Sequence, residues 1–265
     1  MPVISLFKAG FRYGKRTALR DITLQTRPGE FLTVIGPNGS GKSTLLKGIC
    51  GLLRPFEGSI SLDGRPLGGY SRTDIARNIA LMPQSAFLPE LFTAMEIVLM
   101  GRTPHLGLLR YEGSSDILAA ANAMEATETS QLAGRRINQI SGGERQRVLI
   151  ARSLAQEAGI LLLDEPTASL DINYQAGILD FLKKLCRDKG LTIVSALHDV
   201  NLASQFGDRI IVLKDAAVYT EGGPNEVINS HTLQEVFGVN VAVYAHPANG
   251  LPTALITSAA ERELK

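Results

Sequence analysis

A glycine-rich loop followed by a lysine and two hydroxyl residues is the first segment of this sequence with the residue types for chemistry. It fits the pattern G-x-x-x-x-G-K-[ST] and lies between a β-type run and a run of helix formers. Glycines in such a loop let backbone N–H groups point at a phosphate, and the N-terminus of the following helix adds partial positive charge. The residues expected to bind the phosphates of a nucleotide are Gly36, Pro37, Asn38, Gly39, Ser40, Gly41, Lys42, Ser43 and Thr44. Lys42 would reach the β- and γ-phosphates, and the Ser43 hydroxyl would bind Mg²⁺.

Two acids at the end of an apolar run form the second candidate site. Residues 160–163 are apolar, and Asp164, Glu165 and Pro166 follow them. Such a run predicts a buried parallel strand, and α/β sheets bind ligands at the carboxyl ends of their strands. In a chain with a phosphate-binding loop, Asp164 is expected to hold Mg²⁺ through water, and Glu165 to act on the attacking water. Taken alone, the same residues would indicate only a surface turn.

A second glycine-rich helix start lies at Ser141-Gly142-Gly143-Glu144. Serine followed three residues later by glutamate is a capping box, the ordinary way to begin an amphipathic helix. Two glycines in the first turn weaken that helix by about 1 kcal/mol each relative to alanine, and a cap does not require them. Their presence indicates close approach of an anion to the helix N-terminus.

The elements that must position these residues fall into three blocks. Short β-type runs fill the first eighty residues, at 3–10, 18–25, 31–36, 58–64 and 78–84, with one helix at Lys42–Ile49. From about Leu91 to Gln156 apolar residues recur at helical spacing. Strands and helices then alternate to about residue 215, which predicts a parallel sheet covered by helices. We therefore expect a core made of residues 1–84 and 157–240, an inserted helical subdomain at 85–156 and a C-terminal tail at 241–265.

Composition excludes some partners and compartments. The 265 residues carry 27 basic and 26 acidic side chains, a net charge of +1, so no nucleic-acid partner is expected. Cys50 and Cys186 lie far apart in apolar helical sequence and are expected to be core thiols of a reducing compartment. The first residues lack a basic start and a long apolar core, so we expect a protein that stays inside the cell.

Together the three motifs resemble an ATP-binding-cassette (ABC) ATPase over about the first 235 residues. That resemblance implies an α/β fold with a P-loop NTPase, RecA-like core, an antiparallel β-subdomain and an inserted α-helical subdomain. It also implies ATP hydrolysis with Mg²⁺. In this family Glu165 and His198 would act in catalysis, His198 as the switch histidine that bonds the γ-phosphate. Gln84 would be the Q-loop glutamine that contacts Mg²⁺ or the attacking water.

The resemblance assigns two further residues. Tyr13 would stack on adenine, and Asp171, in Ser169-Leu170-Asp171, would belong to the D-loop. Without the family, Tyr13 would indicate a strand aromatic and His198 a structural residue with its hydrogen bonds satisfied.

An assembly is implied as well. In such ATPases the Ser141–Glu144 signature acts in trans, completing the partner's site, so we expect a homodimer or half of a heterodimer. The segment after Gln84, above all residues 98–107, is similar to importers of iron–siderophores, haem, cobalamin and related metal-chelates. Peripheral attachment to a transmembrane permease, itself a dimer, at the cytoplasmic face of the inner membrane is then expected, with an extracytoplasmic binding protein in the same system. Four apolar residues are candidates for the groove that receives the permease or for subdomain core: Phe87, Leu88, Leu91 and Phe92.

The sequence leaves two other functions open. A soluble ABC ATPase of iron–sulfur cluster assembly would bind a scaffold protein in place of a permease. A DNA-repair or chromosome-associated cassette is disfavoured because no long coiled coil separates the motifs and no basic stripe is present. The sequence departs from the family pattern at Ile140, where leucine is usual, and in the turn of residues 213–222, which lacks the common glycine. Neither departure is expected to touch the nucleotide.

Overall fold

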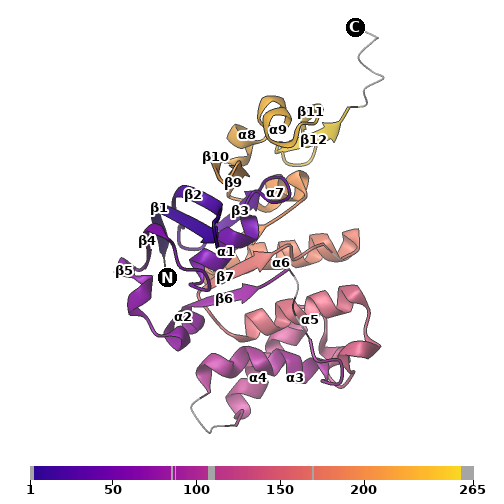
Figure 1. Cartoon of the computed structure of the whole chain (residues 1–265). Coiled ribbons are helices and arrows are strands. Elements are labelled where there is room, and N and C mark those ends of the chain that lie inside the picture. The colour runs from indigo at the N-terminus through magenta and orange to yellow at the C-terminus, as the bar shows by residue number, and fades with distance from the viewer. Residues whose placement is uncertain (1–2, 85, 87, 107–110, 169, 258–265) are drawn as a thin grey trace.

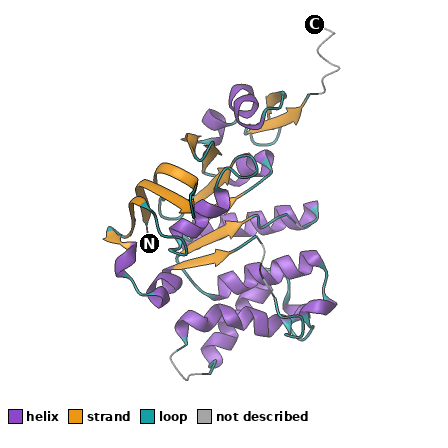
Figure 2. Cartoon of the chain, viewed as in Figure 1, coloured by secondary structure: helices purple, strands orange, loops and turns teal. Residues whose placement is uncertain are grey.

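The structure is a computed structural model that describes residues 3–84, 86, 88–106, 111–168 and 170–257. Figure 1 shows three regions: an N-terminal β-rich region beside a central sheet, a helical region below that sheet, and a C-terminal region above it. Figure 2 shows the same view by secondary structure, with helices concentrated in the lower region. Across the described residues no helix has the length and apolar character needed to cross a membrane.

The central sheet has the strand order β10-β9-β3-β8-β7-β6. Its strands are β3 (Phe31–Ile35), β6 (Ile79–Met82), β7 (Ile160–Asp164), β8 (Thr192–Ala196), β9 (Arg209–Lys214) and β10 (Ala217–Gly222). All pairs are parallel except the β9–β10 hairpin. Both faces of the sheet are covered, which explains why β3, β7 and β8 are buried at every residue. Leu162 and Val194 pack towards α1 (Lys42–Ile49), while Leu161 and Leu163 pack towards α6 (Ile172–Lys189) and the helical region.

An antiparallel sheet with the order β2-β1-β4-β5 covers the α1 side. It is built from β1 (Ile4–Tyr13), β2 (Arg16–Gln25), β4 (Glu57–Leu62) and β5 (Arg65–Pro66). Two short helices, η1 (Leu67–Gly69) and α2 (Arg72–Asn78), connect it to β6. The sequence prediction of a single helix in this block was wrong about α2. That helix buries no residue, so it has no apolar stripe to reveal it.

The helical region contains α3 (Ala94–Leu99), η2 (Met100–His105), α4 (Ser114–Ala126), η3 (Ser130–Leu132), η4 (Ile137–Gln139) and α5 (Gly142–Ala155). Its core joins that of the sheet at α5, which contacts β6. Arg102 lies in residues 98–107, the stretch similar to metal-chelate importers, and is buried. It donates to Asp116 Oδ1 at 3.0 Å and to the Ala155 carbonyl at 2.7 Å. This arginine therefore ties η2 to α4 and to the end of α5. Gly107, at the end of that stretch, lies outside the described residues.

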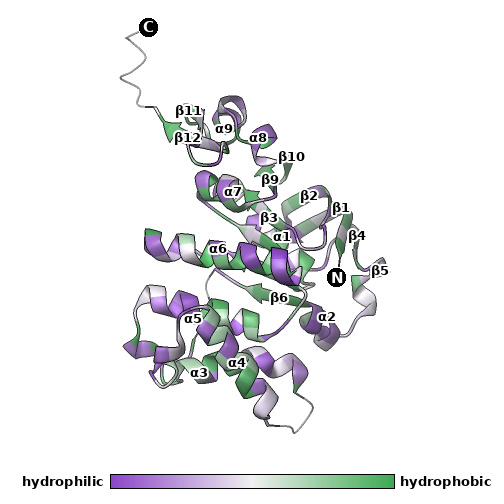
Figure 3. Ribbon diagram, turned by 180° about the vertical axis from the view of Figure 1, so that it is seen from behind, coloured by the Kyte–Doolittle hydropathy of each residue, from purple (hydrophilic) through white to green (hydrophobic). Residues whose placement is uncertain are grey.

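The remaining elements are α7 (Val200–Phe206), α8 (Pro224–Val227), α9 (Ser230–Phe237) and a hairpin of β11 (Val241–Ala245) and β12 (Pro252–Ile256). A separate apolar cluster joins α9 and the hairpin to β3 and β9 of the central sheet. Figure 3 shows the central strands in green and the covering helices banded in green and purple, as expected for helices with one buried face. Both cysteines are free thiols, and burial raises the pKa of Cys186 to about 12.

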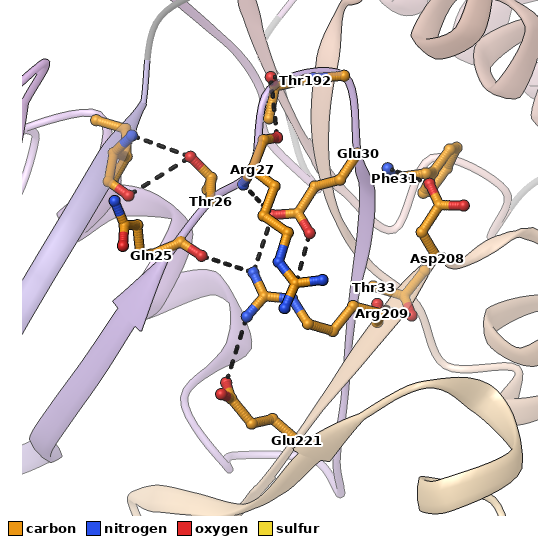
Figure 4. Close-up of polar contacts among 12 residues, drawn as sticks. Gln25, Thr26, Arg27, Glu30, Phe31, Thr33, Thr192, Asp208, Arg209 and Glu221 are labelled. Atoms are coloured by element: carbon orange, nitrogen blue, oxygen red, sulfur yellow. Dashed lines mark hydrogen bonds and ion pairs between the residues drawn. The ribbon is translucent and has the colours of Figure 1, made fainter.

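A buried ion pair fastens the β-subdomain to the central sheet at the edge opposite the carboxyl ends of the strands. Arg209, at the start of β9, donates to Glu30 at 2.9 and 3.2 Å and to the Gln25 carbonyl at 2.6 Å (Figure 4). Glu30 and Arg209 are only 6% and 8% exposed. Glu221 approaches the same guanidinium at 3.7 Å from a half-exposed position. Arg209 of β9 thus joins the end of β2, the start of β3 and β10.

Replacing Arg209 by methionine should destabilise the fold strongly. The substitution roughly conserves side-chain volume but leaves the Glu30 carboxylate buried without its ion-pair partner, so we expect a loss of about 3–5 kcal/mol in the free energy of unfolding. Urea denaturation measures this value. Glu221→Ala is the control, because removing a half-exposed partner should cost less than about 1 kcal/mol. Equal losses in the two variants would contradict the importance assigned to the buried pair.

Candidate functional site

The predicted phosphate-binding loop connects β3 to α1. Gly36 has φ 153° and Gly41 has φ 107°, which are conformations that favour glycine, and a Cβ at Gly36 would lie 2.3 Å from the Leu213 carbonyl oxygen. The loop curls around Lys42, whose Nζ donates to the carbonyls of Gly36 at 2.8 Å and Pro37 at 3.2 Å. Burial lowers the pKa of Lys42, although the nearby acids Glu165 and Asp164 oppose this shift. A buried ammonium that donates to carbonyl oxygens is suited to receive an anion.

The two acids predicted from the sequence lie at the carboxyl end of β7. The Ser43 hydroxyl donates to Asp164 Oδ1 at 3.1 Å, so the first residues of α1 meet the end of β7. Burial raises the pKa of Asp164, against the effect of the Ser43 hydrogen bond. A hydroxyl and a buried carboxylate this close supply the hard oxygen ligands that Mg²⁺ prefers.

Glu165 is the centre of a cluster drawn from three neighbouring strands. Gln84 follows β6 and donates from Nε2 to Glu165 Oε2 at 2.7 Å. His198 follows β8, and its Nε2 pairs with Glu165 Oε1. The structure therefore brings together the three residues predicted to act in catalysis, since β6, β7 and β8 are adjacent in the sheet. Glu165 is 8% exposed and has φ 56°, a left-handed conformation rare for a residue with a side chain.

A cleft of about 900 Å³ joins this cluster to the loop and to the β-subdomain. Predicted residues in its wall are Tyr13, Asn38, Gly39, Gly41, Lys42, Ser43, Thr44, Gln84, Glu165 and His198. The wall also contains residues that the sequence analysis missed, namely Arg16, Thr17, Ala18, Asp215 and Ala216. The first three follow Tyr13 closely in the β1–β2 hairpin, which is the signal that could have identified them.

The turn of residues 213–222, which was not expected to touch the nucleotide, lies in the wall of this cleft. Asp215 and Ala216, with φ 49° and 64°, form the β9–β10 turn and line the cleft. Because β9 pairs with β3, the end of β9 lies beside the start of the glycine-rich loop. The turn takes left-handed conformations without the glycine that usually supplies them.

The Ser141–Glu144 signature lies apart from this cleft. Its capping box is formed: the Glu144 N–H donates to Ser141 Oγ at 3.2 Å, and the Ser141 N–H donates to Glu144 Oε2 at 2.8 Å. None of the four residues lines the cleft, and a Cβ at Gly142 would meet no atom within 4 Å. Asp171 is exposed at the N-terminus of α6 and also lies outside the cleft, and Ser169 is not among the described residues. Among the described residues, no atom lies close enough to require glycine at position 142.

The groove candidates after Gln84 divide into two groups. Leu88 is buried among the residues of the helical core, so that position is core. Leu91 and Phe92 are 70% and 40% exposed and are available to a partner. Phe87 lies outside the described residues.

Comparison with known proteins decides the family. A family model described as ABC transporter matches residues 19–168. The chain belongs to the ABC transporter family. The ferric enterobactin transport ATP-binding protein FepC of Escherichia coli is 38% identical, over 91% of this chain and 89% of that protein. The hemin import ATP-binding protein HmuV of Gloeobacter violaceus is 41% identical over 93% and 91%. The cobalamin import ATP-binding protein BtuD of Halobacterium salinarum is 40% identical over 89% of this chain and 58% of that protein.

Solved structures confirm the predicted fold class. A chain of an inward-facing ABC transporter assigned to the metal-chelate type superposes with a TM-score of 0.84 at 27% identity, over 98% of this chain and 99% of that one. The cassette MJ0796, solved as a dimer in a post-hydrolysis state with ADP and phosphate, gives a TM-score of 0.74 at 34% identity, over 83% and 98%. The resemblance drawn from the motifs and the predicted ABC-type ATPase activity are thereby confirmed.

Tyr13 gives a direct test of the cleft. If it stacks on the base, Tyr13→Ala should weaken ATP binding by about 1–3 kcal/mol, or roughly 5- to 150-fold in Kd, while Tyr13→Phe should bind nearly as well as the wild type. Equilibrium binding of a fluorescent ATP analogue measures both. Phe7→Ala, which removes an exposed aromatic of the same strand that is not in the cleft wall, is the control. An unchanged Kd in Tyr13→Ala would exclude the stacking role.

Proposed function

We propose that this chain is the ATP-hydrolysing subunit of an importer for an iron–siderophore, haem, cobalamin or related metal-chelate. The observation that carries the proposal is that the Gln84–Glu165–His198 cluster and the phosphate-binding loop share one cleft in a chain related almost end to end to FepC and HmuV. Residues 1–84 and 157–240 would form the nucleotide-binding core, residues 85–156 the helical subdomain, and residues 241–265 a C-terminal tail.

In this proposal the residues predicted from the sequence have the following roles. The loop from Gly36 to Thr44 would bind the ATP phosphates. Ser43, Gln84 and Asp164 would hold Mg²⁺, which supplies charge neutralisation at the β- and γ-phosphates. Glu165 would accept a proton from the attacking water. His198, whose side chain is partly exposed in the cleft, would donate a hydrogen bond to the γ-phosphate.

The signature would complete the site of a second copy. The open space around Gly142 and the exposure of Ser141 support this assignment, because both are available to a ligand outside the chain. Ser141, Gly142, Gly143 and Glu144 would then face the γ-phosphate bound by the partner, with Asp171 at the dimer contact. The dimeric state of the similar cassette MJ0796 agrees with a homodimer.

Glu165→Gln tests the chemistry. The amide keeps the shape of the side chain but cannot accept the proton, so this variant should bind ATP, hydrolyse it very slowly and accumulate as an ATP-bound dimer. Phosphate release measures turnover, and sedimentation at saturating Mg-ATP measures the dimer. Turnover at the wild-type rate, or a monomer under those conditions, would contradict the mechanism.

The permease partner needs a separate experiment. Tagged Glu165→Gln protein, solubilised from whole cells in mild detergent, should bring down a polytopic membrane protein at near-stoichiometric yield, identified by mass spectrometry. Adding Leu91→Asp should abolish that recovery, because Leu91 is one of the exposed apolar residues after Gln84. Leu52→Asp is the matched control, because Leu52 is similarly exposed but lies in the nucleotide-binding core. This substitution should leave the recovery of the membrane protein unchanged. Recovery of soluble scaffold proteins alone would favour the iron–sulfur assembly alternative.

A further inference from the structure

Gln146 makes a contact that the proposed chemistry does not use. It lies in the second turn of α5, is 8% exposed, and donates from Nε2 to the carbonyl oxygens of Glu165 and Pro166, both at 3.2 Å. A glutamine on a helix after a capping box carries no signal of its own in the sequence. Its acceptors are the backbone carbonyls of Glu165, whose carboxylate is the centre of the cluster, and of the next residue.

That stretch of backbone has to be held in place. Glu165 has φ 56°, and a residue with a side chain persists in the left-handed region only where its surroundings fix it. On the β8 side the Glu165 N–H donates to the Ala196 carbonyl at 3.0 Å. On the α5 side Gln146 holds the carbonyls of Glu165 and Pro166. The conformation places the carboxylate between Gln84 and His198, so both anchors determine where it lies.

The same helix begins at the signature. Gln146 is five residues after Ser141, about 7 Å along the helix axis. The following residues Val148, Leu149 and Ile150 are buried in the core, which keeps this part of α5 a continuous, well-packed helix. One rigid turn and a half of helix therefore separates the residue that holds Glu165 from the end of α5 proposed to face the partner's nucleotide.

We propose that Gln146 is a positioning residue that links the two ATP sites of the dimer. Through it, a shift of α5 as its N-terminus meets the partner's ATP moves the backbone of Glu165 in its own site. This inference rests on the proposed function, because it assumes that Glu165 acts on water and that the signature acts in trans. Gln146 itself is not among the residues that line the cleft.

Substitution of Gln146 should therefore change turnover and leave binding intact. In the full chain with Mg-ATP, Gln146→Ala is expected to lower kcat roughly 10- to 100-fold, because small displacements of a reacting group carry penalties of that size, with KM for ATP within about twofold. Gln146→Glu keeps the shape but lacks the donor, and should lower kcat similarly. Gln146→Glu replaces Gln146→Ala as the test variant if the alanine variant does not fold.

Gln156 provides a matched control at the other end of α5. Its Nε2 also donates to two backbone carbonyls, those of Ala76 and Ile79, but far from the cleft. Gln156→Ala should lower the Tm about as much as Gln146→Ala while kcat per folded molecule stays unchanged. This separates positioning from a general loss of stability.

The outcomes are distinct. A Gln146→Ala variant with wild-type kcat, or equal losses of kcat in Gln146→Ala and Gln156→Ala, would overturn the positioning role. Glu165→Gln is assayed in parallel. If that variant turns over normally, the proposed role of Glu165 fails, whereas an inactive Glu165→Gln beside an active Gln146→Ala refutes only the inference made here.

Discussion

Burial of opposite charges at one edge of a parallel sheet is the constraint on which this molecule depends. Lys42, at the start of α1 after β3, and Asp164 and Glu165, at the end of β7, are all nearly excluded from solvent. Isolated charges cannot be buried without compensation, and the chain supplies it with carbonyls for Lys42, a hydroxyl for Asp164, and an amide and an imidazole for Glu165. Phosphates and Mg²⁺ would replace these internal partners with stronger ones. In the function proposed, Mg-ATP would thereby relieve the cost of burying these charged groups.

The β-subdomain and the helical region both supply residues that reach this edge of the sheet. The β-subdomain brings Tyr13 across the cleft, and the Arg209–Glu30 pair fastens this subdomain to the opposite edge of the sheet. In the part of the chain that the structure describes, the helical region is connected to the site through Gln84, which directly precedes it, and through α5. Both connections end on Glu165. A permease docked on the helical region and a nucleotide at the start of α5 would then act on the same carboxylate.

Much of this was predictable because the motifs carry their own geometry. Gly36 to Ser43 specifies a strand–loop–helix turn by spacing alone, and the strand ending in Asp164 and Glu165 is specified by its unbroken apolar run. Residues that act through tertiary neighbours were not predictable in this way. Asp215 reaches the cleft only because β9 pairs with β3, a register that no local pattern encodes. In the sequence Gln146 resembles any polar helix residue, and its role depends on the packing of α5 against the end of β7. Leu88 and Leu91 are the same residue type three positions apart, but Leu88 is buried and Leu91 is exposed.

The central claim is that each ATP site is built from two chains, and a mixing experiment tests it most directly. Lys42→Ala removes the phosphate lysine and keeps the signature. Gly142→Asp blocks the signature but should still fold, since a side chain there meets nothing and an acid favours a helix N-terminus. Each variant alone should be inactive, and mixing them should restore ATP hydrolysis, because the mixed dimer contains one intact site. A mixture as inactive as its components would contradict assembly of the site in trans.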